Sequence, residues 1–197
     1  MTSEQARQLA KDTLSPERFY HTECVAKAAR ELAVRYGADE ERCALAAFLH
    51  DILKERDKAD LLKIIEDSAI IDDKLVRDCP SIYHAFAGGA YVRETLGLDE
   101  EISNAVMYHT TGRAGMSKLE KIVMLADYMS ADRDFKGVDE VREVAKTSLD
   151  RACFMSLRNL LIHVIKNMRT VNVKSIESYN WLLKELREQG EDLHVQK

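Results

Sequence analysis

Two segments of the sequence place ionisable side chains inside apolar runs. In CALAAFLHDILKER, residues 43–56, His50 and Asp51 stand side by side after a stretch of apolar residues. In IVMLADYM, residues 122–129, Asp127 is the one carboxylate among apolar neighbours. A helix that is apolar all round is a buried one. A carboxylate buried there needs a partner, because leaving it unpaired costs free energy.

Three further histidines fall on apolar helix surface: His21, His84 and His109. Imidazoles and carboxylates that converge from separate helices suit a divalent transition metal ion. The alternative for any one of these histidines is an ordinary buried polar group with a hydrogen bond. Gly88 and Gly89 follow His84 on the same segment. Since they lack side chains, another backbone or a ligand can approach closely there.

The elements that must hold these residues are predicted to be helices. Only two prolines and eight glycines occur in 197 residues, among many residues that favour helices. No alternating strand pattern, repeat or low-complexity linker interrupts the chain. We therefore expect an all-α protein with residues 1–197 in one domain.

Start and stop signals set the expected bounds of the helices. Ser15 is a candidate N-cap before Pro16, and Gly37 ends that helix. Ser117 and Glu120 have the spacing of a capping box. The expected helices are roughly 1–14, 16–36, 39–55, 58–67, 81–97, 99–111, 117–130, 138–168 and 176–189.

Charge and apolar pattern limit the classes of function. The net charge is −5, and the sequence contains no block of like charges. This argues against non-specific binding of nucleic acid, which needs a basic surface. A small phosphorylated substrate is still compatible with this charge. No segment approaches the roughly 20 apolar residues of a membrane span. We expect a cytoplasmic protein that does not bind membranes, and a homodimer is left open. The four cysteines form no C-x-x-C pair and are expected to be free thiols.

The order His21, His50–Asp51, Asp127 resembles the H…HD…D signature of the HD-domain superfamily of metal-dependent phosphohydrolases. Longer stretches narrow the resemblance to the YqeK family. They are RFYHTECVAKAARELAVRYG, LHDILKE, HAFAGGAYV, MYHTTGRAGMSKLEKIVMLADYMSADR and SYNWLLKEL, and together they cover nearly the whole chain.

This resemblance implies a helical bundle with the metal site between helices. It also implies symmetrical hydrolysis of diadenosine tetraphosphate to two ADP by metal-activated hydroxide. The implied site holds two divalent ions, with iron favoured and manganese, cobalt, nickel or zinc as alternatives. In it the first ion is held by His21, His50, Asp51 and Asp127. The second is held by His84 and His109, and Asp51 bridges the two.

Other residues are candidates for substrate contact. Lys54 and Arg18 share helix faces with metal-site histidines, so each either contacts phosphate or is a solvated side chain. Arg133 is the best candidate for bidentate phosphate binding. The segment Thr110–Thr111–Gly112 either donates hydrogen bonds at the pocket rim or forms a helix C-cap turn. Asp51, Lys54 and Arg133 are the expected catalytic residues, while His163 and His194 are assigned no role in the site.

One segment departs from the family pattern. After Asp127 and Tyr128 the family usually has an acidic residue and a proline before its arginine, whereas here Ser130, Ala131 and Asp132 precede Arg133. Two alternatives to the tetraphosphatase reaction stay open. One is another HD-type nucleotide hydrolase acting on nucleoside mono- or triphosphates or on an alarmone. The other is a helical binding module with a structural metal.

Overall fold

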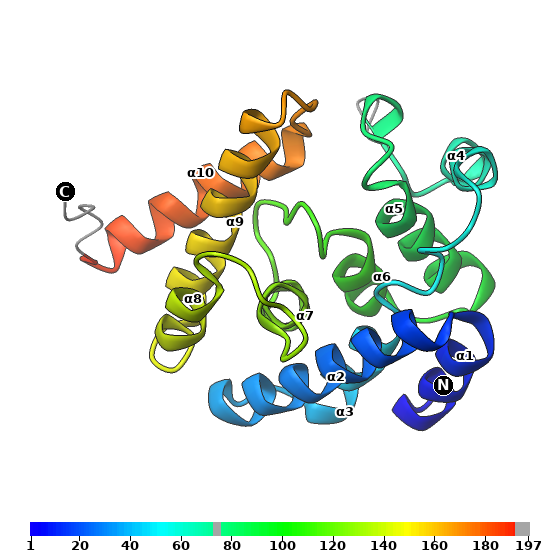
Figure 1. Ribbon diagram of the computed structural model, residues 1–197, viewed down its shortest axis with the longest axis horizontal. Coiled ribbons are helices and arrows are strands. Elements are labelled where there is room, and N and C mark those ends of the chain that lie inside the picture. The colour runs from blue at the N-terminus through cyan, green and yellow to red at the C-terminus, as the bar shows by residue number, and fades with distance from the viewer. Residues whose placement is uncertain (73–75, 192–197) are drawn as a thin grey trace.

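A computed structural model describes residues 1–72 and 76–191, and every regular element in these ranges is a helix (Figure 1). The elements in chain order are α1 (Ser3–Thr13), α2 (Pro16–Tyr36), α3 (Glu40–Leu49), α4 (Lys58–Asp67), η1 (Val76–Asp78), α5 (Tyr83–Ala90), η2 (Tyr91–Thr95), α6 (Glu100–Met107), α7 (Lys118–Met129), α8 (Val138–Val144), α9 (Leu149–Lys166) and α10 (Val173–Glu188). The predicted all-α class is confirmed, while the single domain of residues 1–197 stays a prediction.

Local capping signals set several helix ends as predicted. The Ser15 side chain accepts a hydrogen bond from the Arg18 amide at the start of α2, and Gly37 ends that helix at φ +62°. At the start of α7, Ser117 and Glu120 form the reciprocal capping box. These contacts lie within three residues of each other, which is why sequence alone could predict them.

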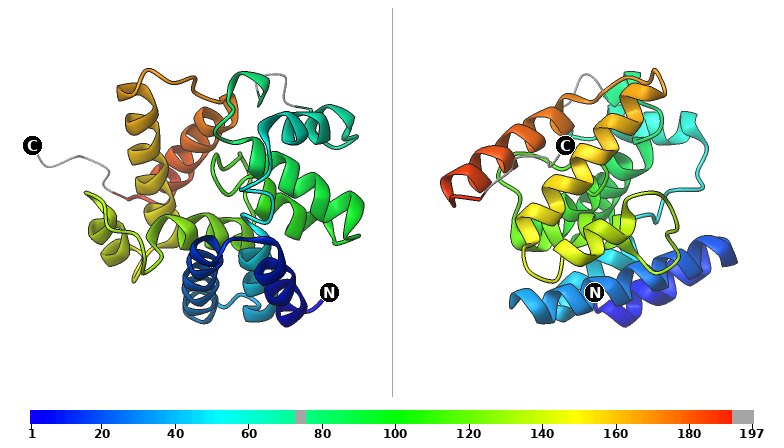
Figure 2. Two further views of the ribbon diagram at one scale, coloured as in Figure 1. Left: turned by 45° about the vertical axis from the view of Figure 1, so that its right-hand side comes forward. Right: turned by 60° about the vertical axis from the view of Figure 1, so that its left-hand side comes forward.

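Helix α7 lies at the centre of the arrangement that forms the site. It contacts α2, α6 and α9, while α3 packs against α2 and α5 packs against α6. Figure 1 shows α4, α5 and α6 on one side of α7, and α8, α9 and α10 on the other. The left-hand view in Figure 2 keeps the same grouping. Side chains of α7 therefore face both groups of helices.

Several predicted helices are shorter than expected or are broken. The helix expected over 99–111 ends at Met107, so His109 lies in the turn that follows, and the one expected over 81–97 is α5 followed by η2. The helix expected over 39–55 ends at Leu49, and residues 50–55 continue as tight turns in which the Lys54 amide bonds to the Asp51 carbonyl at 2.8 Å. The helix expected over 138–168 is broken into α8 and α9, because the Ser148 side chain caps a new helix by accepting from the Arg151 amide. The break after Leu49 places His50 and Asp51 at the start of the turns over 50–55.

The glycine pair of α5 serves helix packing. A Cβ atom on Gly89 would lie 2.5 Å from the Met107 Cβ and 2.9 Å from the Met107 Cα of α6. A Cβ on Gly88 would meet the Val106 Cγ1 at 3.2 Å. The predicted close approach is therefore made by α6, which brings α5 and α6 together beside the histidines.

The four cysteines are free thiols, as expected. Burial raises the pKa of the Cys43 thiol to about 12. Within the described ranges, none of the helices combines the length and apolar character that crossing a membrane requires.

Candidate metal centre

Four histidine rings meet in a row, each from a different part of the chain. His21 lies on α2, His50 follows α3, His84 lies on α5 and His109 follows α6. Ring centroids are 5.4 Å apart for His21 and His50, 5.1 Å for His50 and His109, and 5.3 Å for His84 and His109. The structure thus brings together the histidines that the sequence singled out.

Asp51 lies at the middle of this row, with its side chain only 3% exposed. Its Oδ2 is 3.6 Å from His50 Nε2. Its Oδ1 is 3.2 Å from His84 Nε2 and 3.7 Å from His109 Nε2. Burial alone would raise the pKa of Asp51, but the neighbouring His50 ring, a hydrogen bond from His84 and the charge of Lys54 outweigh it and hold the pKa well below its usual range. The Asp51 carboxylate therefore lies close to the Nε2 atoms of three histidine rings at once.

Asp127, which lies on α7, contacts the His21 end of the row of histidines. Its Oδ1 lies 3.1 Å from His21 Nε2 and 3.9 Å from His50 Nε2. On the opposite edge of the His21 ring, Nδ1 is 2.7 Å from Asp132 Oδ2. Sequence reasoning did not assign Asp132 a role, since nothing in its spacing points to a ring 111 residues earlier.

The tautomers of two histidines are fixed by backbone carbonyls. His50 Nδ1 lies 2.7 Å from the Ala47 carbonyl oxygen, and His109 Nδ1 lies 2.8 Å from the Val106 carbonyl oxygen. A carbonyl oxygen can only accept, so each Nδ1 carries the proton and each Nε2 keeps a free lone pair. Burial lowers the pKa of both rings, that of His109 to about 3, so both are neutral at pH 7. Metal-binding histidines show this arrangement.

Two buried atoms at the centre have no hydrogen-bond partner in the described part of the chain: His50 Nε2 and Asp51 Oδ1. Unpartnered buried polar atoms are rare in folded proteins. Donor atoms lie within 4.8 Å of one another in two groups, which are His21, His50, Asp127 and His50, Asp51, His109. Neutral imidazoles and carboxylates at this spacing fit a divalent metal ion.

Cationic side chains surround these donors. Lys54 Nζ lies 2.9 Å from His84 Nε2 and 3.6 Å from Asp51 Oδ1. Arg18 donates from Nη1 to Asp51 Oδ2 at 3.1 Å. Arg133 donates to the Asp127 carboxylate and, from Nε, to its backbone carbonyl at 3.1 Å. All three predicted cations therefore reach the carboxylates of the centre.

The loop between α7 and α8 is held by Arg142, which lies on α8. Arg142 donates from Nε to the Met129 carbonyl at 3.0 Å. Its Nη2 donates to the carbonyls of Ser130 at 2.7 Å and Arg133 at 2.8 Å. The loop lacks the proline that the family usually has, and these three hydrogen bonds restrain it instead. They set the position of Asp132 and Arg133.

Of the three residues that follow His109, the first lines a cavity and the other two are buried away from it. Thr110 lines a cavity of about 600 Å³ that begins at His109 and Asp127. The Thr111 hydroxyl donates to the Gly112 carbonyl at 3.0 Å, and the Cβ position of Gly112 lies against Ser178 of α10. Both of these residues are buried and neither lines the cavity. Gly112 at φ +62° makes the turn that sequence reasoning kept as an alternative.

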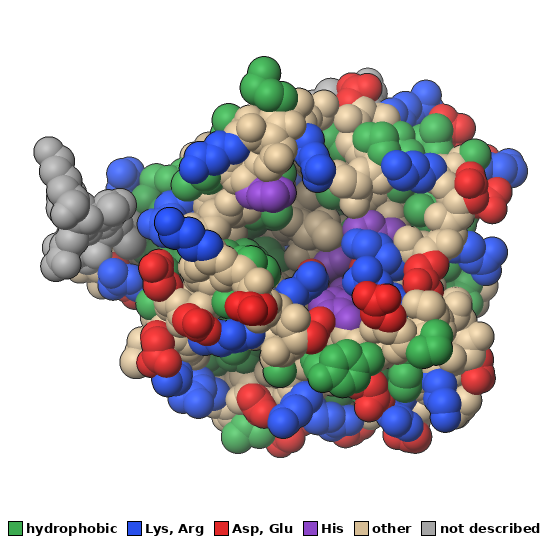
Figure 3. All heavy atoms as spheres, viewed as in Figure 1, with side chains coloured by type: hydrophobic (Ala, Val, Ile, Leu, Met, Phe, Trp, Pro, Cys, Tyr) green, Lys and Arg blue, Asp and Glu red, His purple; other side chains and the backbone are tan. Residues whose placement is uncertain are grey.

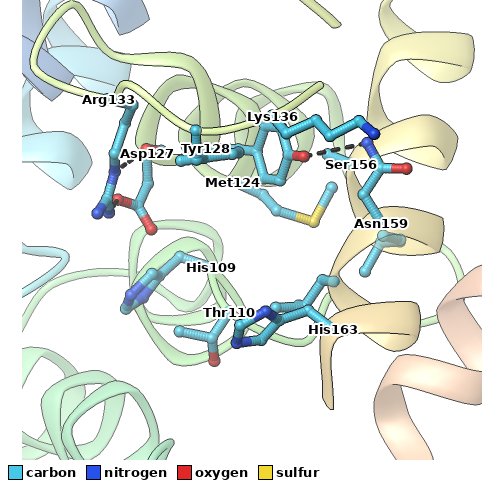
Figure 4. Close-up of a pocket in the computed structure, with 13 residues that line it drawn as sticks. His109, Thr110, Met124, Asp127, Tyr128, Arg133, Lys136, Ser156, Asn159 and His163 are labelled. Atoms are coloured by element: carbon cyan, nitrogen blue, oxygen red, sulfur yellow. Dashed lines mark hydrogen bonds and ion pairs between the residues drawn. The ribbon is translucent and has the colours of Figure 1, made fainter. Parts of the chain in front are cut away.

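The cavity extends from the metal donors to α9. Figure 3 shows the hollow, with histidine and cationic side chains gathered at it, and Figure 4 shows the residues that face it. The lining is formed by His109, Thr110, Met124, Asp127, Tyr128, Arg133, Phe135, Lys136, Ser156, Leu157, Asn159, Leu160 and His163. Sequence reasoning missed Lys136 and gave His163 no role, because neither has a nearby motif. His194 lies outside the described residues.

Residues 18–132 match the HD domain family. The matched segment contains all six candidate metal ligands. The chain belongs to the HD-domain family. The HD domain implies divalent metal binding, in agreement with the donor set described above.

Relatives that match over nearly their whole length indicate which members of the HD-domain family this chain resembles. The chain is 40% identical over 186 residues to the "Bis(5'-nucleosyl)-tetraphosphatase, symmetrical" of Halalkalibacterium halodurans, covering 94% of this chain and 99% of the relative. It is 38% identical to the protein of the same name in Bacillus subtilis, and the match covers 93% of this chain and 98% of that relative. A crystal structure described as a "predicted HD superfamily hydrolase involved in NAD metabolism" from Clostridium acetobutylicum superposes with a TM-score of 0.85. It is 32% identical and covers 92% of this chain and 97% of that one. The predicted YqeK resemblance is confirmed.

Proposed function

We propose that this HD-domain protein hydrolyses diadenosine tetraphosphate and related dinucleoside polyphosphates symmetrically, and that its hydrolytic site is the centre around Asp51. The observation that carries the proposal is the pair of buried, unpartnered donor atoms, His50 Nε2 and Asp51 Oδ1. Symmetrical tetraphosphatases among the relatives support the reaction type.

The proposed centre holds two divalent ions, and iron is the favoured metal. One ion would be held by His21, His50, Asp51 and Asp127, and the other by His84 and His109 with Asp51 shared. Such a pair supplies an activated water and neutralises charge on phosphoryl oxygens. Two of the histidines are already neutral with Nε2 unprotonated, so binding requires no proton loss from them.

The remaining chemistry belongs to side chains of this chain. Lys54 and Arg133 are proposed to bind phosphate oxygens and offset the charge that builds up on them. Arg18 would hold Asp51 in place through the Oδ2 contact. In the reaction, the oxygen of water bonds to one central phosphorus, and the bridging oxygen leaves with the other half. Two nucleoside diphosphates form, and both protons of the water are released as the new terminal phosphates ionise.

Product analysis tests the reaction. The purified protein is incubated with diadenosine tetraphosphate and ferrous or manganese ions, and the products are separated by chromatography. ADP as the sole product supports the proposal. AMP with ATP would mean a different cleavage position, and no product from metal-loaded protein would favour another nucleotide substrate or a binding module.

A matched pair of variants assigns the activity to the centre. Asp51→Ala removes the shared carboxylate and is expected to abolish metal binding and turnover. Asp134→Asn changes an exposed carboxylate of the α7–α8 loop and is expected to leave both unchanged. Equal loss in the two variants contradicts the assignment. Cytoplasmic location and a homodimer stay predictions.

A further inference from the structure

A tight turn after α7 carries two side chains to the metal centre. The Arg133 amide donates to the Ser130 carbonyl at 3.0 Å, which closes a four-residue β-turn. Asp132, the third residue of this turn, places its Oδ2 2.7 Å from His21 Nδ1. Arg133, the fourth, donates to the carboxylate of Asp127, as Figure 4 shows. The turn therefore reaches both members of the pair formed by His21 and Asp127.

The orientation of His21 depends on this turn, whereas two other rings of the centre are oriented locally. The Nδ1 atoms of His50 and His109 donate to carbonyls only three residues earlier in the chain. His21 Nδ1 instead donates to the Asp132 carboxylate, 111 residues further along, and this leaves Nε2 facing Asp127 Oδ1 at 3.1 Å. Partners of this kind orient a metal-binding histidine and raise its basicity. A shift of the turn would therefore be passed directly to the His21 ring.

Arg142 on α8 holds both ends of the turn. Its guanidinium donates to the carbonyl of Met129, just before the turn, at 3.0 Å. It also donates to the carbonyls of the first and last turn residues, Ser130 at 2.7 Å and Arg133 at 2.8 Å. The donors of an arginine form a rigid planar fork, so the three carbonyls are fixed relative to one another. Its ion pair with Asp139, a side chain 88% exposed, contributes little beside these bonds.

We propose that Arg142 is a positioning residue of the metal centre, which keeps Asp132 on the His21 ring by holding the turn at both ends. The inference rests on the proposed function, which places His21 among the metal ligands. It extends the site to α8, a helix that supplies no ligand. Loss of Arg142 is expected to free the turn and to weaken metal binding without removing any ligand atom.

Ala131→Pro would restrain the same turn independently of Arg142. Ser130 has φ −51° and ψ 157°, the extended conformation that a residue before proline adopts. Ala131 is exposed and is the second residue of the turn, the position at which proline is favoured. The Ala131 amide donates no hydrogen bond within the described part of the chain, so a proline there removes no contact. The geometry of the turn thus provides a way to restore its position in a variant that lacks Arg142.

Competition between the purified protein and a chelator for Mn²⁺ tests the inference. Arg142→Met removes the donors but keeps the apolar stem, and is expected to weaken Mn²⁺ binding about tenfold, as loss of a histidine's orienting partner does. Arg151→Met makes the same chemical change on α9, where the side chain is 44% exposed, and is expected to match the wild type. The Tm of each metal-free protein is measured in parallel, because a loss of stability alone would lower Tm without selectively weakening metal binding.

Two double variants separate positioning from a general structural role. Ala131→Pro combined with Arg142→Met is expected to bind Mn²⁺ within about threefold of the wild type, while Ala131→Pro alone keeps wild-type affinity and raises Tm by about 1–4 °C. In the Asp132→Asn background, Arg142→Met is expected to weaken Mn²⁺ binding by less than about twofold further. The two changes are not additive in this case, because Arg142 acts through Asp132.

Wild-type Mn²⁺ affinity in Arg142→Met overturns the inference. A loss that Ala131→Pro does not recover, or a further tenfold loss in the Asp132→Asn background, overturns it as well. If Arg142→Met fails to fold, Arg142→Lys decides, because lysine keeps the charge but not the planar fork, and wild-type affinity in that variant also overturns the inference.

The metal measurements use no nucleotide, so the two proposals fail separately. Weakened Mn²⁺ binding in the Arg142 variants of a protein that does not cleave diadenosine tetraphosphate contradicts the proposed function alone. Symmetrical cleavage by the wild type, with unchanged Mn²⁺ affinity in the Arg142 variants, contradicts the positioning role alone.

Discussion

The close packing of α5 against α6 at Gly89 gives a quantitative prediction for Gly89→Ala. The added Cβ would lie 2.5 Å from Met107 Cβ and 2.9 Å from Met107 Cα, whereas carbon atoms in contact are about 3.5–4.0 Å apart. Because Met107 Cα belongs to the backbone, rotation of a side chain cannot relieve the clash. The two helices α5 and α6 must separate by about 1 Å.

The expected change in the free energy of unfolding is the sum of a gain in helix propensity and a loss from overpacking. Alanine in place of glycine inside a helix gains about 1 kcal/mol. Overpacking costs about 1–3 kcal/mol, and a clash with backbone lies at the upper end of that range. The expected net loss is about 1–2 kcal/mol in the free energy of unfolding. At roughly 2–4 °C per kcal/mol for a chain of this size, Tm falls by about 2–8 °C.

The same displacement reaches the metal centre, because α5 carries His84 and His109 follows α6. A misplacement of about 1 Å can cost on the order of 100-fold in rate. Calorimetry of metal-free protein gives Tm, and elemental analysis after dialysis gives retained metal. Gly89→Ala is expected to lower both.

Gly88→Ala is the matched control for this variant. Its Cβ would meet only Val106 Cγ1, at 3.2 Å, and a side-chain methyl can shift by a few tenths of an ångström. We expect its Tm to equal or exceed that of the wild type. A Tm for Gly89→Ala as high as that of Gly88→Ala would refute the packing argument.

Two further predictions concern the histidines. Asp132→Asn removes the carboxylate 2.7 Å from His21 Nδ1 and is expected to weaken metal affinity about 10- to 100-fold in chelator competition. The exposed Asp134→Asn serves as its control, and equal affinities would show that Asp132 does not position the ring. His109 has a folded pKa of about 3 against about 6.5 when unfolded, so the unfolded chain binds more protons between these values. Metal-free protein is therefore expected to lose about 2 kcal/mol between pH 7 and pH 5 in denaturant titrations, and equal or greater stability at pH 5 contradicts this.

Local signals explain what the sequence could predict. Ser15 and Ser117 cap helices through amides three residues away, so the pattern and its partner stand together in the chain. The convergence of His50, Asp51 and Asp127 was predictable for a different reason. Their burial is unfavourable without partners, so the apolar context itself required them to meet.

Contacts between distant segments explain what the sequence could not predict. His163 belongs to a helix with no acidic neighbour, and only the packing of α9 against α7 brings it to the cavity. Asp132 and His21 are 111 residues apart. The break at Ser148 was missed because 138–168 is periodic throughout, and a capping serine inside a helical pattern also fits an uninterrupted helix.

The hydrogen bonds from Arg142 to the α7–α8 loop have a consequence for truncated forms of the protein. A proline restrains the unfolded chain as well as the folded one. The hydrogen bonds of Arg142 act only when α8 is docked. A fragment that stopped at residue 132, where the family match ends, would keep all six candidate ligands yet lose the restraint on Asp132. A fragment that keeps this restraint on the loop therefore has to extend past the family match, at least through α8.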